Sequence, residues 1–235
     1  MLLLDWISFL LTLYLPFCFD ERGRYSYDQS LVHTVVLSSE HDMASGSRQH
    51  AWLQKDLAAV NRTITPWIVV EMHRPMYREY PLLSSGSFAL SLSLTSSTLI
   101  VSFRMTSTDS EIFDKTKWQA PTILEGMQEQ IEDLLHSHRV DLVLSGHYHS
   151  YFRSCSGLYS YRCDNGGPTY VTVGTGGAPL DGSAQSSVMV NHYTEALDKT
   201  RFGVGRASVF NATHLHWEFV AVGGNVTDEV WLRKQ

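Results

Sequence analysis

Apolar runs and helical spacings divide most of the chain into alternating strands and helices. Three short apolar runs, at Val32–Leu37, Trp67–Met72 and Val140–Leu144, are typical of strands that are covered on both faces. Apolar residues recur at helical spacing over Ser47–Val60, where Ser47 is a suitable N-cap, and again over Ile123–His138. This order predicts βαβ units and a parallel sheet.

Beyond residue 165 the pattern changes to short strands separated by glycine-rich turns. We expect strands at Tyr170–Val173, Ala207–Phe210, His214–Val220 and Glu229–Leu232. Such a succession fits a sheet packed against a second sheet with helices outside. The sequence therefore predicts an α/β (α+β) fold.

The first twenty residues form an apolar segment that is a poor example of a targeting signal. It has no early Lys or Arg, and it contains Asp5 and Pro16. Three interpretations are open: a signal anchor, an atypical signal peptide, and a wrongly predicted start of the gene model, which we favour. A membrane is expected as a partner only if residues 1–19 act as an anchor.

A second unusual segment, residues 81–103, is rich in Ser and Leu and carries no charge. Its Leu/Ser alternation would suit a two-faced strand, and its many hydroxyls argue against a membrane span. We favour translated intron or another gene-model artefact as its origin, with a flexible active-site loop as the alternative.

Three histidines follow the ends of two predicted strands. His147 and His149 come after the Val140–Leu144 strand, two positions apart, and His73 comes directly after the Trp67–Met72 strand. An isolated His-x-His pair is more often two ordinary loop histidines. The carboxyl ends of parallel strands, however, meet at one edge of a sheet, where ligands gather. We therefore predict a metal site at His73, His147 and His149.

Together these segments resemble the purple acid phosphatases of the metallophosphoesterase superfamily. The resemblance runs from about Tyr25 to Trp231 and is interrupted only by residues 81–103. The segments that carry it, in order, are Tyr25–Tyr27, Val35–Ser39, Gln49–Leu57, Val60–Trp67, the His73 strand, Gly146–His149, Gly167–Gly174, Phe202–Arg206 and Asn211–Trp217.

The resemblance implies a four-layer α-β-β-α sandwich and acid phosphatase-type, metal-dependent hydrolysis of small-molecule phosphomonoesters. The family's cofactor is a dinuclear centre of Fe³⁺ with Zn²⁺, Mn²⁺ or Fe²⁺. By this resemblance His73 and His147 match ligands of the divalent metal, and His149 matches a ligand of the ferric ion. Cys155 and Cys163 match a small disulfide loop of some members, with two free thiols as the alternative.

The carboxylate motifs of the family are missing from this sequence. Neither its Gly-Asp-x-x-Tyr nor its Gly-Asn-His-Glu motif occurs, and a pair of cations needs a bridging carboxylate. We therefore expect residues 21–235 to be the C-terminal part of the catalytic domain, a partial sandwich that lacks its N-terminal strands. We assign no catalytic residue and expect an incomplete metal centre. A non-catalytic pseudoenzyme, or a phosphodiesterase of the same superfamily, is the alternative.

Composition and the remaining polar residues refine this picture. The 235 residues carry a net charge of -6, which gives no reason to expect nucleic acid as a partner. Three sequons, at Asn61, Asn211 and Asn225, would be glycosylated in a secreted or lysosomal/vacuolar protein. We expect structural roles for the other conspicuous polar residues, with pairing to a carboxylate favoured over phosphate binding for the arginine: His136, His138, Arg153, His214 and His216.

Overall fold

The computed structural model describes residues 23–77, 88–95, 98–105, 121–181 and 191–234. The apolar segment 1–20 lies outside these residues. Part of the unusual segment 81–103 lies outside them as well.

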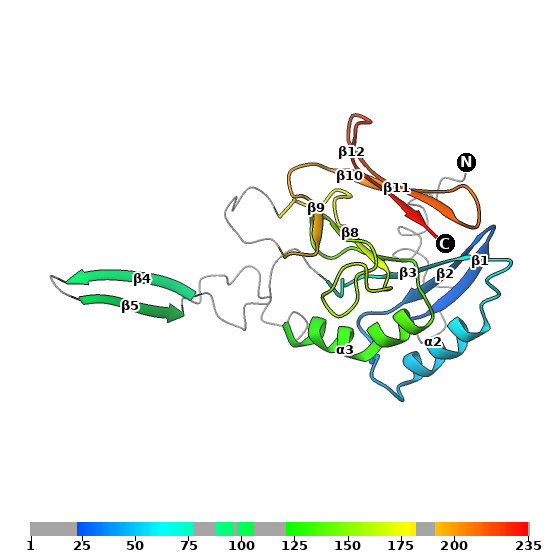
Figure 1. Ribbon diagram of the computed structural model, residues 1–235, viewed down its shortest axis with the longest axis horizontal. Coiled ribbons are helices and arrows are strands. Elements are labelled where there is room, and N and C mark those ends of the chain that lie inside the picture. Colours follow the sequence, from blue (N-terminus) through cyan, green and yellow to red (C-terminus); the bar gives the residue numbers. More distant parts are fainter. Residues whose placement is uncertain (1–22, 78–87, 96–97, 106–120, 182–190, 235) are drawn as a thin grey trace.

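The largest element is a seven-stranded mixed sheet with the strand order β1-β2-β3-β6-β8-β7-β9 (Figure 1). Its four central strands β2, β3, β6 and β8 run parallel, and the outer strands pair antiparallel. The bounds are β1 Tyr25–Gln29, β2 Val32–Leu37, β3 Trp67–Met72, β6 Leu142–Ser145, β7 Tyr151–Ser154, β8 Thr169–Val173 and β9 Thr194–Asp198.

Two helices cover one face of this sheet (Figure 1). Helix α2 spans Arg48–Ala59, and the Ser47 side chain caps it by accepting a hydrogen bond from the His50 amide. Helix α3 spans Pro121–Ser137. Both helices therefore form where the apolar spacing predicts them. Their buried residues join the sheet in one core: Leu53, Leu57, Met127, Ile131 and Leu135 pack with Val35, Ile68, Val70 and Val143.

A three-stranded antiparallel sheet packs on the opposite face (Figure 1). It consists of β10 Gly203–Val209, β11 His214–Ala221 and β12 Val226–Arg233. Leu215, Trp217 and Phe219 of β11 are buried against Val69, Leu142 and Val171 of the large sheet. The described residues thus form three layers of the expected α-β-β-α sandwich, namely helices, large sheet and small sheet.

The small sheet shows where the sequence pattern was misleading. We expected its first strand at Ala207–Phe210, but β10 begins four residues earlier, at Gly203. The reason is that Trp217 covers Gly205, where an added Cβ would lie 2.2 Å from the indole ring. A glycine that normally weakens a strand is here the residue that makes room for a large neighbour.

The segment 81–103 contributes to a two-stranded antiparallel sheet of β4, Phe88–Thr95, and β5, Thr98–Met105. Its Leu/Ser alternation therefore does correspond to strand structure. In Figure 1 the hairpin extends away from the two packed sheets. In the described part of the chain it pairs with neither of the other sheets.

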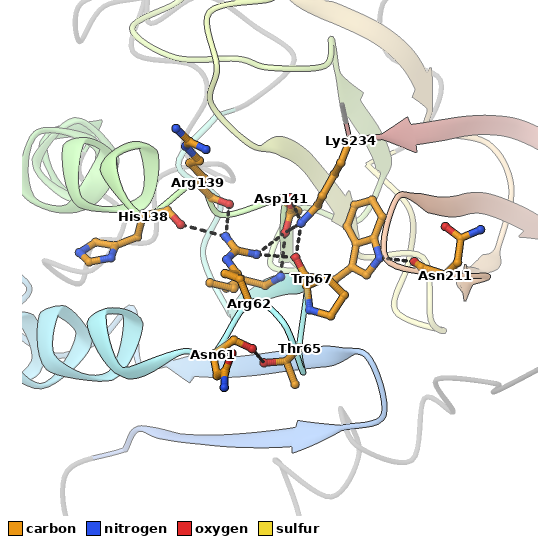
Figure 2. Close-up of polar contacts among 11 residues, drawn as sticks. Asn61, Arg62, Thr65, Trp67, His138, Arg139, Asp141, Asn211 and Lys234 are labelled. Carbon is orange, nitrogen blue, oxygen red and sulfur yellow. Dashed lines mark hydrogen bonds and ion pairs between the residues drawn. The ribbon is translucent and has the colours of Figure 1, made fainter.

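A polar cluster closes the end of the large sheet at which the parallel strands begin (Figure 2). The Asp141 carboxylate accepts hydrogen bonds from Arg62, at 3.0 Å, from the Lys234 ammonium, at 2.8 Å, and from the backbone N–H of Ile68, at 2.8 Å. Lys234 also lies over the Trp67 ring, 4.2 Å from its centroid. Lys234, directly after β12, is thereby attached to Asp141, directly before β6, and through Asp141 to the start of β3.

Candidate metal centre

The register of two neighbouring parallel strands brings two of the predicted ligands, His73 and His147, together. Met72, the last residue of β3, pairs with Ser145, the last residue of β6, so both strands end at the same level. The backbone N–H of Gly146 then donates a 3.1 Å hydrogen bond to the carbonyl of His73. His147 follows with a left-handed backbone, φ 67°. The two turns therefore begin side by side.

The rings of His73 and His147 are in contact. Nδ1 of His147 lies 3.1 Å from Nε2 of His73, and the ring centroids are 4.9 Å apart in an edge-on arrangement. On its other side, Nε2 of His147 lies 3.4 Å from a guanidinium N–H of Arg74. Because an arginine only donates, this Nε2 is the acceptor, and Nδ1 of His147 carries the proton that faces His73.

Burial keeps both imidazoles neutral near pH 7. It lowers the pKa of His73, and it lowers the pKa of His147 to about 4, with the charge of Arg74 acting in the same direction. A neutral imidazole is the form that binds a metal ion. The protonation state of these two side chains therefore suits a ligand role.

The third predicted residue, His149, has an orientation typical of metal-binding histidines. Its Nδ1 lies 2.8 Å from the carbonyl of Pro179, which fixes the proton on Nδ1 and leaves Nε2 with its lone pair. Its backbone N–H donates to Asp181, at 2.9 Å. Its charge acts on the pKa values of His73 and His147.

Gly174, the residue directly after β8, approaches this loop closely and holds it in place. Gly174 N–H donates to the Ser150 carbonyl at 3.0 Å, and a Cβ on Gly174 would lie only 1.7 Å from the Tyr148 carbonyl. Only glycine fits there.

The three histidines nevertheless do not form a compact set of donors. In the described ranges, the one group of three or more residues whose donor atoms all lie within 4.8 Å of one another is elsewhere.

The structure adds two charged residues that the sequence analysis did not single out. Arg74 is buried, and its Nε donates a 2.6 Å hydrogen bond to Glu40. The charge of Glu40 also acts on His73. Arg74 could have been noticed from the sequence, because it directly follows the predicted ligand His73. Glu40 is 33 positions earlier and only the fold brings it here.

A third residue, Glu71, lies in β3 two positions before His73. Burial raises its pKa to about 7, so the carboxyl group is partly protonated at neutral pH. Glu71 could have been noticed from the sequence, because it is the one charged residue in the apolar run of β3. A raised carboxyl pKa is a frequent feature of functional sites, and this one lies two positions before His73 in the chain.

The polar residues for which we expected structural roles are placed as follows. Arg153 pairs with Asp228 through two nitrogens, at 2.7 and 2.9 Å, so the carboxylate partner is confirmed. His136 stacks on Tyr159, with centroids 3.9 Å apart. The remaining contacts are those of the His138 carbonyl with Arg62, of His214 with Thr213 and Asn211, and of His216 with Glu229.

Two further predictions from the sequence concern the cysteines and the sequons. Cys155 and Cys163 are joined by a disulfide with a Cα–Cα distance of 5.7 Å. The three sequon residues Asn61, Asn211 and Asn225 are all exposed. In Asn61 and Asn211 the side-chain oxygen accepts hydrogen bonds from the residue two positions later.

Comparison with known proteins shows the family to which the sequence is similar. A family model described as "Iron/zinc purple acid phosphatase-like protein C" matches residues 167–229. The chain is 31% identical over 222 residues to the probable purple acid phosphatase 20 of Arabidopsis thaliana. That alignment covers 91% of this chain and 43% of the relative, so the chain spans less than half of the relative's length.

Solved structures show the same fold. A purple acid phosphatase, PPD1, from yellow lupin (Lupinus luteus) seeds superposes with a TM-score of 0.66 at 23% identity, over 94% of this chain and 34% of that one. GAP50, described as the anchor in the inner membrane complex of Plasmodium, superposes with a TM-score of 0.57 at 16% identity, over 92% of this chain and 56% of that one. The architecture is that of a partial metallophosphoesterase sandwich, and the chain belongs to the purple acid phosphatase family.

Proposed function

We propose that the chain is the C-terminal part of a phosphoester hydrolase and contributes three imidazole ligands, His73, His147 and His149, to its metal centre. The observation that carries this proposal is the contact between His73 and His147 at the carboxyl ends of two parallel strands. Both rings are kept neutral by burial. The domain is residues 21–235, with 81–103 as an insertion.

The donor set fits one metal ion better than two. Imidazole nitrogens suit zinc and iron, but a dinuclear centre also needs a bridging carboxylate. Two nearby carboxylates are engaged in other contacts: Glu40 pairs with Arg74, and Asp181 accepts from the amide of His149. We therefore expect an incomplete centre of the family's Fe³⁺ with Zn²⁺, Mn²⁺ or Fe²⁺ type.

When bound, such a metal supplies an activated hydroxide and stabilises charge on the phosphoryl oxygens. The residues of this chain would hold the ion and orient the substrate. His149 donates Nδ1–H to the Pro179 carbonyl, which leaves the lone pair on its Nε2. Arg74 is buried between Glu40 and His147 and contacts both side chains, so it helps to fix the orientation of the His147 ring.

The substrate that we propose is a small phosphomonoester, with a phosphodiester as the alternative. A non-catalytic role is the second candidate, because the described residues near the histidines offer no bridging carboxylate. The structural neighbour GAP50, which is described as an anchor, is consistent with such a role for this fold.

The described residues include no helix long and apolar enough to cross a membrane.

We further propose that the protein passes through the secretory pathway to the cell exterior or to a lysosome or vacuole. The disulfide between Cys155 and Cys163 favours an oxidising compartment. The exposed sequons Asn61, Asn211 and Asn225 would then be available for glycosylation. Treatment of the secreted protein with a glycosidase should increase its electrophoretic mobility.

The test of the metal centre combines metal binding with hydrolysis. Zn²⁺ should bind the metal-free chain, and His147→Ala should lower the number of Zn²⁺ ions bound per chain by one, while His50→Ala, on α2, should leave that number unchanged. We expect a colourless protein whose hydrolysis of mono- and bis-4-nitrophenyl phosphate stays at background with added iron and zinc. Unchanged Zn²⁺ stoichiometry in His147→Ala would refute the ligand assignment. Metal-dependent hydrolysis lost in His147→Ala would show that this chain alone is an enzyme.

A further inference from the structure

The outer face of the small sheet carries a second group of metal-binding side chains. Strand β11 alternates strictly between buried and partly exposed residues, so His216 and Glu218 both point outward. Glu229 of β12 joins them. The three side chains offer donor atoms that all lie within 4.8 Å of one another.

The ring of His216 is fixed between the two carboxylates. Its Nε2 lies 3.0 Å from Glu229, and its Nδ1 lies 3.8 Å from Glu218. The ring stacks on Trp231, with centroids 4.3 Å apart and planes 16° from parallel. Only 12% of the His216 side chain is exposed, so little conformational freedom remains to be lost when it binds an ion.

The sheet register supplies an independent reason for a cation at this position. Glu218 and Glu229 are directly opposite one another on antiparallel strands. Two like charges in this arrangement repel and weaken the strand pairing. Arg206 compensates one of them, because it forms two hydrogen bonds to Glu218, at 2.8 and 3.0 Å. Glu229 pairs instead with the ring of His216.

We propose that His216, Glu218 and Glu229 bind a Zn²⁺-like divalent cation that bridges β11 and β12. One nitrogen with two carboxylate oxygens is a donor set suited to zinc, whereas calcium and magnesium prefer oxygen alone. Donors in a tetrahedral zinc site lie roughly 3.3 Å apart, given bonds near 2 Å. The 62% exposed side chain of Glu229 can make the required adjustment and leaves a path for the ion.

This site is separate from the histidines of the proposed metal centre and does not depend on their role. The test is therefore made in the His147→Ala background, by titrating Zn²⁺ into the metal-free chain in a calorimeter. We expect one Zn²⁺ per chain, and we expect Zn²⁺ to raise the melting temperature. Both effects should disappear with His216→Ala, and His214→Ala, two positions away on the same strand, is the matched control.

Two further variants keep the test informative if His216→Ala fails to fold. Glu229→Gln changes an exposed side chain and should weaken Zn²⁺ binding at least tenfold. Arg206→Gln should strengthen it about tenfold, because it removes a positive charge that competes for Glu218. Absence of Zn²⁺ binding in His147→Ala, or equal affinity with and without His216, would overturn the proposal. A weaker affinity in Arg206→Gln would also contradict it.

Discussion

Replacement of Asp141 by Asn should destabilise the protein more than any other single Asp→Asn change at the base of the large sheet. The carboxylate is 14% exposed and accepts from Arg62, from Lys234 and from the Ile68 amide. An amide keeps the shape and one acceptor, but its NH₂ group then faces one of two cations. Loss of a buried ion-pair partner costs about 3–5 kcal/mol.

That range requires a discount for solvent, because Arg62 and Lys234 are 32% and 26% exposed. Arg62 also keeps its hydrogen bonds to the Pro66 and His138 carbonyls. We therefore expect a loss of about 2–3 kcal/mol, which corresponds to a melting temperature lower by about 4–12 °C for a chain of this size.

Urea denaturation followed by circular dichroism, at low micromolar protein, measures this loss. The matched control is Asp164→Asn, since Asp164 is exposed and its φ of 53° is one that asparagine tolerates well. An Asp141→Asn variant within about 0.5 kcal/mol of this control would show that the cluster contributes no more than an ordinary surface ion pair.

Two other predictions concern stability. The hydrogen bond to Asp56, with a second one to Asp28, raises the pKa of His33, and burial opposes this effect. The stability that this raised pKa contributes is fully present below about pH 6.5 and is lost as the pH rises through the folded-state pKa. The free energy of unfolding should therefore fall above pH 6.5. A His33→Gln variant whose free energy of unfolding depends on pH in the same way as that of the wild type would contradict this. Reduction of the Cys155–Cys163 disulfide should cost roughly 2.5 kcal/mol of loop-closure entropy. The Cys155→Ser/Cys163→Ser double variant should have this lower stability and be insensitive to reductant, and a wild type insensitive to reductant would refute the estimate.

Strands with apolar runs could be predicted from the sequence almost to the residue. β2 and β3 begin and end where expected, because both faces of these strands are covered and most of their positions are apolar. Strands β1, β7 and β9 were not identified. They lie at or near the sheet margins and carry polar residues such as Arg153, whose partner Asp228 is 75 positions away.

The candidate site was predictable only in part, for a similar reason. His73 and His147 follow strand ends, and that position is a local signal. The contacts of Arg74 with Glu40, and of Asp141 with Lys234, join segments separated by 34 and 93 positions. No local periodicity contains such pairs, so charged residues in turns could be recognised but not assigned partners.

The two ends of the parallel strands are linked by register. At the base, Asp141 accepts from the amide of Ile68, and at the opposite edge the amide of Gly146 donates to the carbonyl of His73. A slip of β6 by one residue against β3 would move His147 by about 3.3 Å, which is more than the length of a metal–nitrogen bond. The ion pairs at the base therefore help to keep His147 within reach of His73, although they lie at the other end of the sheet.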